Sequence, residues 1–237
     1  MALSVARRIL PALLLAALPL PVPAASLTVA PTRIDLAGDD RAEVVTLRNN
    51  AAEAVMVQVQ TFAWSDGPAT AELTPTRDVL AVPPVFELAP AGSQIIRVAL
   101  RATEAGDRER AYRLLITEVP RGGGGGTGVR FALRLSLPVF VTPPGATPRA
   151  VWSLVGSGAE RRLVLRNEGS AHLQVRRITL GQAEGDREPA VIETPAYVLA
   201  GQEHAWPLPA RAGAATLRLE AETSVGPLSA TLVPPRD

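Results

Sequence analysis

The chain has 237 residues and a formal net charge of only +1, which excludes the broad basic surface that nucleic-acid binding requires. It contains no cysteine, so disulfides, thiolate metal sites and thiol nucleophiles are excluded as well. All 24 basic residues are arginines, and any cationic binding group must therefore be a guanidinium. The 22 prolines and 19 glycines are typical of a chain with many short turns.

The chain begins with the pattern of a secretory signal peptide. Arg7 and Arg8 precede an apolar run at 9–22 that is short and rich in proline for a membrane span, and small residues follow it. A retained anchor is the alternative. We expect residues 1–25 to be removed and the mature protein to reside in a bacterial periplasm, without membrane insertion. A secreted chain that lacks cysteine depends on a packed core for its stability.

From residue 26 onward, short stretches of alternating apolar and polar residues follow one another, and helical periodicity is hard to find. Turn sequences rich in Gly, Asp, Asn and Pro separate these stretches at intervals of about 8–12 residues. Such spacing predicts an all-β sandwich. The clearest stretches are 26–36, 42–50, 54–64, 93–100 and 112–120.

The longest alternating run is GVRFALRLSLPVFV at 128–141, and it follows a run of five glycines. Every odd position from 129 to 141 is apolar, which predicts a strand with one fully apolar face. At about 3.3 Å per residue it would extend about 40 Å, roughly twice a usual strand. Pro138 cannot donate to a neighbouring strand, so we expect an edge strand, at least near its end. A long apolar edge promotes aggregation. We therefore expect this strand to have a function that requires an exposed edge, unless its apolar face packs inside its own domain.

Two pairs of segments resemble each other and indicate a duplicated module. Residues 45–61 are similar to 163–179, since both contain a strand, an Arg-Asn turn and a second strand. Residues 86–98 are likewise similar to 197–209. Coincidental turn chemistry is the alternative explanation.

The connection between the two modules is expected in the Pro- and Gly-rich segment 142–150, which is short enough to hold them at a fixed angle. The predicted fold is therefore all-β, with two tandem immunoglobulin-like β-sandwich domains set at an angle. We place the N-terminal domain at 26–144 and the C-terminal domain at 145–237.

Residues that could carry catalysis or bind a metal are sparse. His172 and His204 are the only histidines, and neither belongs to a cluster with metal-ligand spacing. We expect His172 at a solvent-facing strand position and His204 in a surface turn. The glycine-rich run at 121–128 lacks the Lys-Ser/Thr end of a phosphate-binding loop and is interpreted as a hairpin loop. The sequence predicts no enzyme, no cofactor and no metal site.

Four motifs, in order along the chain, resemble the periplasmic chaperones of the chaperone–usher pathway, which fold pilus subunits. The first domain matches this family well, and the second is recognisable mainly by its position. The LPVFV ending at 137–141 looks most like the archaic branch, which serves spore-coat-U-type subunits. The motifs are VAPTRIDL (29–36), VVTLRNNAAEAVMVQVQTFAW (44–64), LAVPPVFELAPAGSQIIRV (80–98) and YRLLITEVP (112–120).

The resemblance implies that the chain binds pilus subunits and delivers them to an outer-membrane usher. Subunits of this pathway are sandwiches that lack their last strand, and an edge strand of the chaperone fills the open groove by β-strand addition. Here the pocket-filling residues of that strand would be Val129, Phe131, Leu133 and Leu135. We expect these side chains to face the subunit and to be nearly free of burial in the isolated protein. The same edge allows self-association of the free protein.

The family also anchors the C-terminal carboxylate of the subunit on two basic residues between the domains. Arg33 matches the first by its motif, and a guanidinium can bind a carboxylate through two parallel hydrogen bonds. The second falls on Pro138 in this sequence, so we expect Arg134, which leaves the same face of the strand, to replace it. Glu118 matches the acid of the interdomain contact, whose usual basic partner falls on Thr142.

A structural protein, namely a secreted immunoglobulin-like pilin or adhesin subunit, is the main alternative. A pilin would carry its own N-terminal donor extension, and residues 26–32 do alternate, with Leu27 and Val29 apolar. It would, however, lack the motif at 112–120. An enzyme with a β-sandwich accessory module is a third class, which the chain length and the missing catalytic motifs disfavour.

Overall fold

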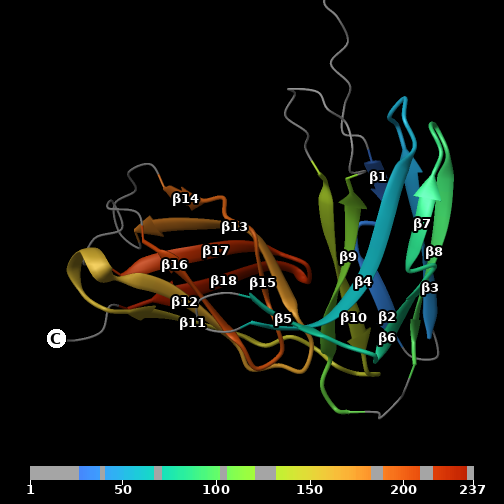
Figure 1. Ribbon diagram of the computed structural model, residues 1–237. Helices are drawn as coiled ribbons and strands as arrows, with labels where there is room; N and C mark the ends of the chain where they lie inside the picture. The colour runs from blue at the N-terminus through green and yellow to red at the C-terminus, as the bar shows by residue number, and fades with distance from the viewer. Residues whose placement is uncertain are drawn as a thin grey trace, which may run out of the picture.

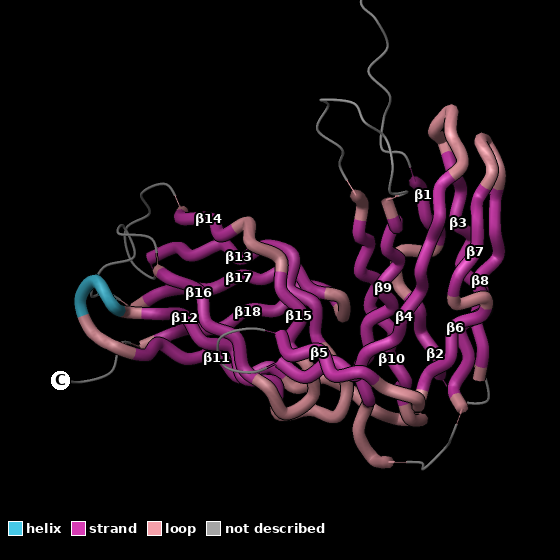
Figure 2. The backbone as a smooth tube through the Cα atoms, viewed as in Figure 1, coloured by secondary structure: helices cyan, strands magenta, loops and turns pink. Residues whose placement is uncertain are grey.

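Nearly all residues that the computed structural model describes form or connect β-strands (Figure 1). Figure 2 shows strand throughout both halves of the molecule, with one helical turn, η1 (Gly158–Glu160), among the described residues. The prediction of an all-β chain is confirmed. The described residues are 27–37, 41–66, 71–101, 106–120, 132–182, 189–208 and 216–233.

The first sandwich packs a four-stranded sheet against a six-stranded sheet. The four-stranded sheet has the order β1-β3-β8-β6, and the six-stranded sheet has the order β2-β10-β9-β4-β5, with β7 also paired to β4. The strands are β1 (Leu27–Ala30), β2 (Ile34–Ala37), β3 (Ala42–Asn49), β4 (Val55–Asp66), β5 (Ala71–Pro75), β6 (Val79–Val82), β7 (Val85–Leu88), β8 (Ser93–Leu100), β9 (Arg110–Val119) and β10 (Arg134–Thr142).

The second sandwich is built in the same way from a three-stranded and a five-stranded sheet. The first has the order β11-β12-β16, and the second has the order β14-β13-β17-β18, with β15 paired to β13. The strands are β11 (Ala150–Val155), β12 (Arg162–Asn167), β13 (Leu173–Gln182), β14 (Ala190–Ile192), β15 (Ala196–Val198), β16 (Glu203–Pro207), β17 (Leu217–Thr223) and β18 (Gly226–Leu232).

Each sandwich has its own hydrophobic core, as alternating sequences require. Every second side chain of a strand points between the two sheets, so the alternate apolar residues gather there. Leu47, Leu114 and Val139 are fully buried in the first core, and Leu165 and Leu219 in the second. Figure 1 shows the two sandwiches meeting at one end of each, with their long axes at an angle.

A buried asparagine occupies the same turn in both sandwiches. The amide nitrogen of Asn49 donates to three backbone carbonyls, one of them that of Leu88. The amide nitrogen of Asn167 donates to two, one of them that of Val198. Both asparagine side chains are inaccessible to solvent, and both lie at the Arg-Asn turn of the similar segments found in the sequence. The internal similarity of the sequence therefore corresponds to a turn with a buried asparagine that is present in each sandwich.

The connecting segment 143–149 is bonded to the second sandwich. The backbone of Thr147 donates to Ser170 Oγ at 3.1 Å, and the backbone of Ser170 donates to Thr147 O at 2.8 Å. Gly169 lies so close that a Cβ atom there would be 2.3 Å from Thr147 O, so no larger residue fits. The segment therefore follows the second sandwich closely. The boundary expected between residues 144 and 145 stays a prediction.

Candidate functional site

Strand β10 has an edge that is paired on one side only. Its partner β9 runs antiparallel to it from Arg134 to Val141. On its other side β2 pairs in parallel, but only from Val139 onward. Among the described residues, 134–138 therefore have no strand on that second side. The open edge was expected near the end of the strand; it lies in the first half, because β2 covers the second half.

The apolar face of β10 points between the two sheets of its own domain. Leu137 and Val139 are buried in the first core, and Leu133 and Leu135 are half-buried against it. The expectation that these side chains are nearly free of burial is therefore wrong for Leu133 and Leu135. The alternation that buries Val139 sends every odd residue of the strand to the same side. Val129 and Phe131 lie outside the described residues.

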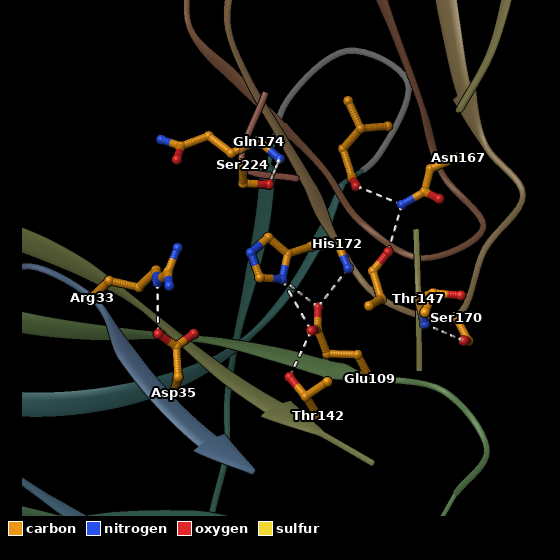
Figure 3. Close-up of polar contacts among 12 residues, drawn as sticks. Arg33, Asp35, Glu109, Thr142, Thr147, Asn167, Ser170, His172, Gln174 and Ser224 are labelled. Atoms are coloured by element: carbon orange, nitrogen blue, oxygen red, sulfur yellow. Dashed lines mark hydrogen bonds and ion pairs between the residues drawn. The ribbon is translucent and has the colours of Figure 1, made fainter. Parts of the chain in front are cut away.

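Arg33 lies directly beside the open edge. Ile34 pairs with Val139, so Arg33, one residue earlier, is level with Pro138 on the outer face of the sheet. Its Nε atom donates to Oδ2 of Asp35 at 2.7 Å, and 42% of each side chain is exposed (Figure 3). The guanidinium is therefore accessible and already has one carboxylate partner.

A second arginine, Arg113 on β9, is level with Arg33 in the direction across the strands. It pairs with Pro138 in the β9–β10 ladder, so Pro138 separates the two arginines. The guanidinium carbon of Arg113 lies 3.6 Å from the ring centroid of Trp64, a cation–π contact that fixes it on the outer face. Sequence reasoning missed this residue. The sequence did contain one signal for it. Arg113 lies between two core residues of β9, so its side chain must point away from the core.

Arg134 is exposed on the same outer face but lies farther from Arg33. It is four residues before Pro138, a separation of about 13 Å along a strand. The structure therefore places Arg33 and Arg113 on either side of Pro138, while Arg134 stands at the far end of the open edge.

A buried carboxylate, Glu109, joins the two sandwiches. Its oxygens accept from the hydroxyl of Thr142 at 2.8 Å and from the backbone N–H of His172 at 2.9 Å. The Nδ1 atom of His172 lies 2.8 Å from the same carboxylate, and only 2% of the Glu109 side chain is exposed (Figure 3). The backbone N–H of Glu109 also donates to the carbonyl of Ser170 at 2.8 Å.

The acid expected at this interdomain contact was Glu118, and the structure places it elsewhere. Glu118 lies at the other end of β9, about 30 Å from Glu109 along an extended strand. Its carboxylate accepts a long hydrogen bond of 3.5 Å from the backbone of Leu133, inside the first domain. The expected partner position, Thr142, does take part in the interdomain contact, but with Glu109.

Aromatic rings cover the rest of the junction. Trp64 and Phe140 from the first sandwich form a buried cluster with Leu199, and Tyr197 packs against it. The imidazole of His172 stacks on Phe140, and 11% of its side chain is exposed. The expectation that His172 faces solvent is therefore wrong, because the loop before β13 turns its ring into the junction.

A cavity of about 330 Å³ lies beside this cluster, lined by Trp64, Glu109 and Leu199 among others. Tyr112 also lines it and donates its hydroxyl to Asp78 at 3.2 Å. Burial raises the pKa of Tyr112 to about 12, and Asp78 adds to the rise while Arg110 opposes it.

In the part of the chain that the structure describes, no three His, Asp or Glu side chains gather as a metal site would require. Within the same residues, no helix has the length and apolar composition needed to cross a membrane.

Two sequence comparisons place the chain among known proteins. The family model described as "Pili and flagellar-assembly chaperone, PapD N-terminal domain" matches residues 26–147, just over half of the chain. The chaperone protein FaeE of Escherichia coli is 32% identical over 123 residues, which cover 50% of this chain and 44% of FaeE. The match thus spans less than half the length of that curated relative.

Solved chaperone structures share the fold over most of the chain. The CsuC–CsuE chaperone–tip subunit complex from archaic chaperone–usher pili of Acinetobacter baumannii matches with a TM-score of 0.67 at 18% identity, covering 90% of this chain and 100% of that one. The SafB chaperone complex with SafA pilin from Salmonella enterica gives 0.63 at 16% identity, covering 90% and 99%. The E. coli chaperone DraB gives 0.61 at 20% identity, covering 87% and 96%. The predicted fold of two immunoglobulin-like sandwiches is confirmed.

Proposed function

This chain belongs to the family of pili and flagellar-assembly chaperones, and we propose that it binds pilus subunits in the periplasm and delivers them to an outer-membrane usher. The observation that carries this proposal is the open edge of β10 at 134–138, with Arg33 at its end. Unpaired backbone groups of an edge strand are ready to accept an added strand. The subunit would supply that strand.

The geometry of the edge favours one direction for the added strand. An incoming strand on the open side of 134–138 lies in line with β2, which is parallel to β10. If it also runs parallel to β10, its last residue reaches the level of Pro138, directly before Arg33. Its terminal carboxylate then meets the guanidinium. An antiparallel strand would place its carboxyl end at the other end of the open edge, away from Arg33.

We propose that Arg33 anchors this carboxylate, since guanidinium–carboxylate pairs form strong, directed hydrogen bonds. A second guanidinium can come from Arg134, as the sequence suggested, or from Arg113, which lies level with Arg33 across Pro138. We favour Arg113 because it is level with Arg33, whereas Arg134 lies about 13 Å farther along the strand.

The apolar residues of β10 supply the other part of the proposed contact. Val129, Phe131, Leu133 and Leu135 would fill the open groove of the subunit. Full burial of an apolar side chain contributes about 1.5–3 kcal/mol, and Leu133 and Leu135 contribute less because they are half-buried already. In the subunit complex, Leu133 and Leu135 would contact both the core of their own domain and the core of the subunit.

The proposed role is binding and stabilisation, with no catalysed reaction. We place the chain in the archaic branch because of the LPVFV sequence and the likeness to CsuC. The alternative of a pilin or adhesin subunit is disfavoured by membership of a chaperone family that matches 26–147. Glu118, which the resemblance assigned to the interdomain contact, lies at the far end of β9, and we propose Glu109 for that role instead.

Periplasmic co-expression with a pilus subunit that lacks its last strand tests the proposal. We expect a one-to-one complex whose chaperone chain begins near Ala25 or Ser26 by N-terminal sequencing. Hydrogen exchange should slow in the complex at those backbone amides of 134–137 that point away from β9, since an added strand pairs them. A complex that leaves these amides as exchangeable as in the free protein would show that binding occurs elsewhere.

A further inference from the structure

We propose that Asp35 competes with the bound chain end for the guanidinium of Arg33 and so keeps this anchor reversible. The inference rests on the proposed function, because it concerns the same carboxylate site. Asp35 itself belongs to neither the open edge nor the core.

Asp35 is placed to compete by the geometry of β2. Residues two apart on a strand project from the same face, so Arg33 and Asp35 lie side by side on the outer surface. Oδ2 of Asp35 accepts from Nε of Arg33 at 2.7 Å (Figure 3). The backbone of Asp35 is held by β10, where it is level with Phe140, and its N–H donates to Glu43 at 3.2 Å. The carboxylate therefore stands beside the anchor in the free protein.

The occupied Nε atom limits how another carboxylate can bind. A guanidinium offers bidentate contacts through its Nε–Nη side or through its two Nη groups. Asp35 uses the first of these, so an incoming carboxylate must displace Asp35 or bind beside it. Displacement costs the ion pair with Asp35, and binding beside it brings two carboxylates together on one guanidinium, so either mode weakens the binding.

Stability of the fold does not account for the pair. Both side chains are 42% exposed, and exposed ion pairs of this kind contribute little to folding. A nearby carboxylate is nevertheless able to change the affinity for an anion, because that effect acts directly between the two charges. A chaperone that must later release its subunit would gain from such a built-in competitor.

The test compares two substitutions of Asp35 with a peptide probe in two forms. Asp35→Asn removes the charge but keeps an oxygen that can accept from Nε, whereas Asp35→Ala removes both. The probe is a fluorescent decapeptide of alternating valine and threonine, with its C-terminus either free or amidated. We expect both variants to bind the free-acid peptide about 3- to 10-fold more tightly than the wild type, and the amidated peptide equally. Raising the salt concentration should reduce this gain.

Arg33→Ala, alone and combined with Asp35→Asn, distinguishes a failure of the carboxylate anchor from a failure of the proposed competition. Arg33→Ala should abolish the preference for the free acid, and Asp35→Asn should then have no further effect. If wild type binds neither form, or both equally, the carboxylate anchor fails and this inference fails with it. If wild type prefers the free acid but Asp35→Asn leaves the preference unchanged, the anchor stands and competition is refuted. A weaker preference in Asp35→Ala would show that Asp35 positions Arg33, which also overturns competition.

Discussion

The imidazole of His172 lies flat against the phenyl ring of Phe140, with 3.6 Å between the ring centroids and 8° between their planes. Phe140 belongs to β10, the strand with the open edge, and His172 directly precedes β13 of the second sandwich. The same imidazole contacts the carboxylate of Glu109. The proposed binding strand is thus joined directly to the other half of the molecule.

The first prediction concerns the junction. Glu109→Gln removes the charge and replaces one of the two accepting oxygens by an amide donor, which weakens the hydrogen bonds to Thr142 and His172. We expect the free energy of unfolding to fall by about 1–3 kcal/mol, because a buried charge-assisted network is broken. Urea unfolding measures this, and small-angle scattering should show a wider spread of interdomain angles. Glu168→Gln, whose carboxylate pairs with the exposed Arg149, is the matched control and should change neither. Equal stability of the two variants would contradict a structural role for Glu109.

The second prediction concerns the anchor. Arg33→Ala should leave the melting temperature unchanged, because its ion pair with Asp35 is exposed. Recovery of the subunit complex should drop sharply, since a hydrogen bond to a charged group contributes about 1.5–3 kcal/mol. Arg149→Ala removes an exposed ion pair in the segment bonded to the second sandwich and serves as control. Subunit recovery at the wild-type level with Arg33→Ala would exclude the anchor role.

A third prediction distinguishes the two candidates for the second anchor. Arg113→Gln should reduce subunit recovery more than Arg134→Gln, because Arg113 is level with Arg33 and Arg134 is not. Arg113→Gln also removes the cation–π contact with Trp64, so its melting temperature must be measured alongside. The reverse order of loss, with both variants fully folded, would assign the second anchor to Arg134.

The fourth prediction concerns the apolar face of β10. Leu135→Ser should lower stability only modestly, because Leu135 is half-buried, but it should abolish subunit capture. Leu137→Ser should instead lower the free energy of unfolding by about 2–5 kcal/mol, because that side chain is 3% exposed in the core. Thermal melting and subunit pull-down on the same preparations measure both effects. Equal destabilisation by the two substitutions would mean that Leu135 serves mainly the core of its own domain.

The fifth prediction is a loss of stability at alkaline pH. The pKa of Tyr112 is about 12 in the folded chain against 10.0 for an unperturbed tyrosine. Between these values the unfolded chain releases a proton that the folded chain keeps, so the free energy of unfolding falls as pH rises, by up to about 2–3 kcal/mol. Below pH 10 the effect is absent. Urea unfolding at pH 9 and 11.5 measures it, and Tyr112→Phe should have a shallower decline. An identical decline in both proteins would refute the assignment.

The sandwich architecture was predictable from the sequence because alternation decides which side chains enter a core. The stretches at 42–50 and 93–100 became β3 and β8, in which Val45, Leu47, Ile96 and Val98 are buried. The Arg-Asn turns identified the two modules, since a buried asparagine closes each sandwich. Arg33 was found through a motif, and its place beside the open edge follows from the pairing of Ile34 with Val139.

The contacts between the sandwiches could not be predicted in the same way. They depend on how two loops meet, and period-2 patterns contain no information on this. The alternation of His172 with Leu173 therefore suggested solvent, while the ring packs on Phe140. Glu118 was chosen by motif, although Glu109, nine residues earlier on the chain, makes the interdomain contact. The exposure of Leu135 was overestimated because the face of β10 expected to meet a subunit also points into the core of its own domain.

The hydrogen bonds that join Glu109 to Thr142 and His172 have a thermodynamic consequence for any ligand. With these bonds formed in the free chain, the two sandwiches have little conformational freedom left to lose when a ligand arrives. Almost all of the conformational entropy that is lost on binding is then lost by the ligand. Among ligands that bury the same surface, the stiffest will bind most tightly, and the affinity will depend on the flexibility of the partner rather than that of this protein.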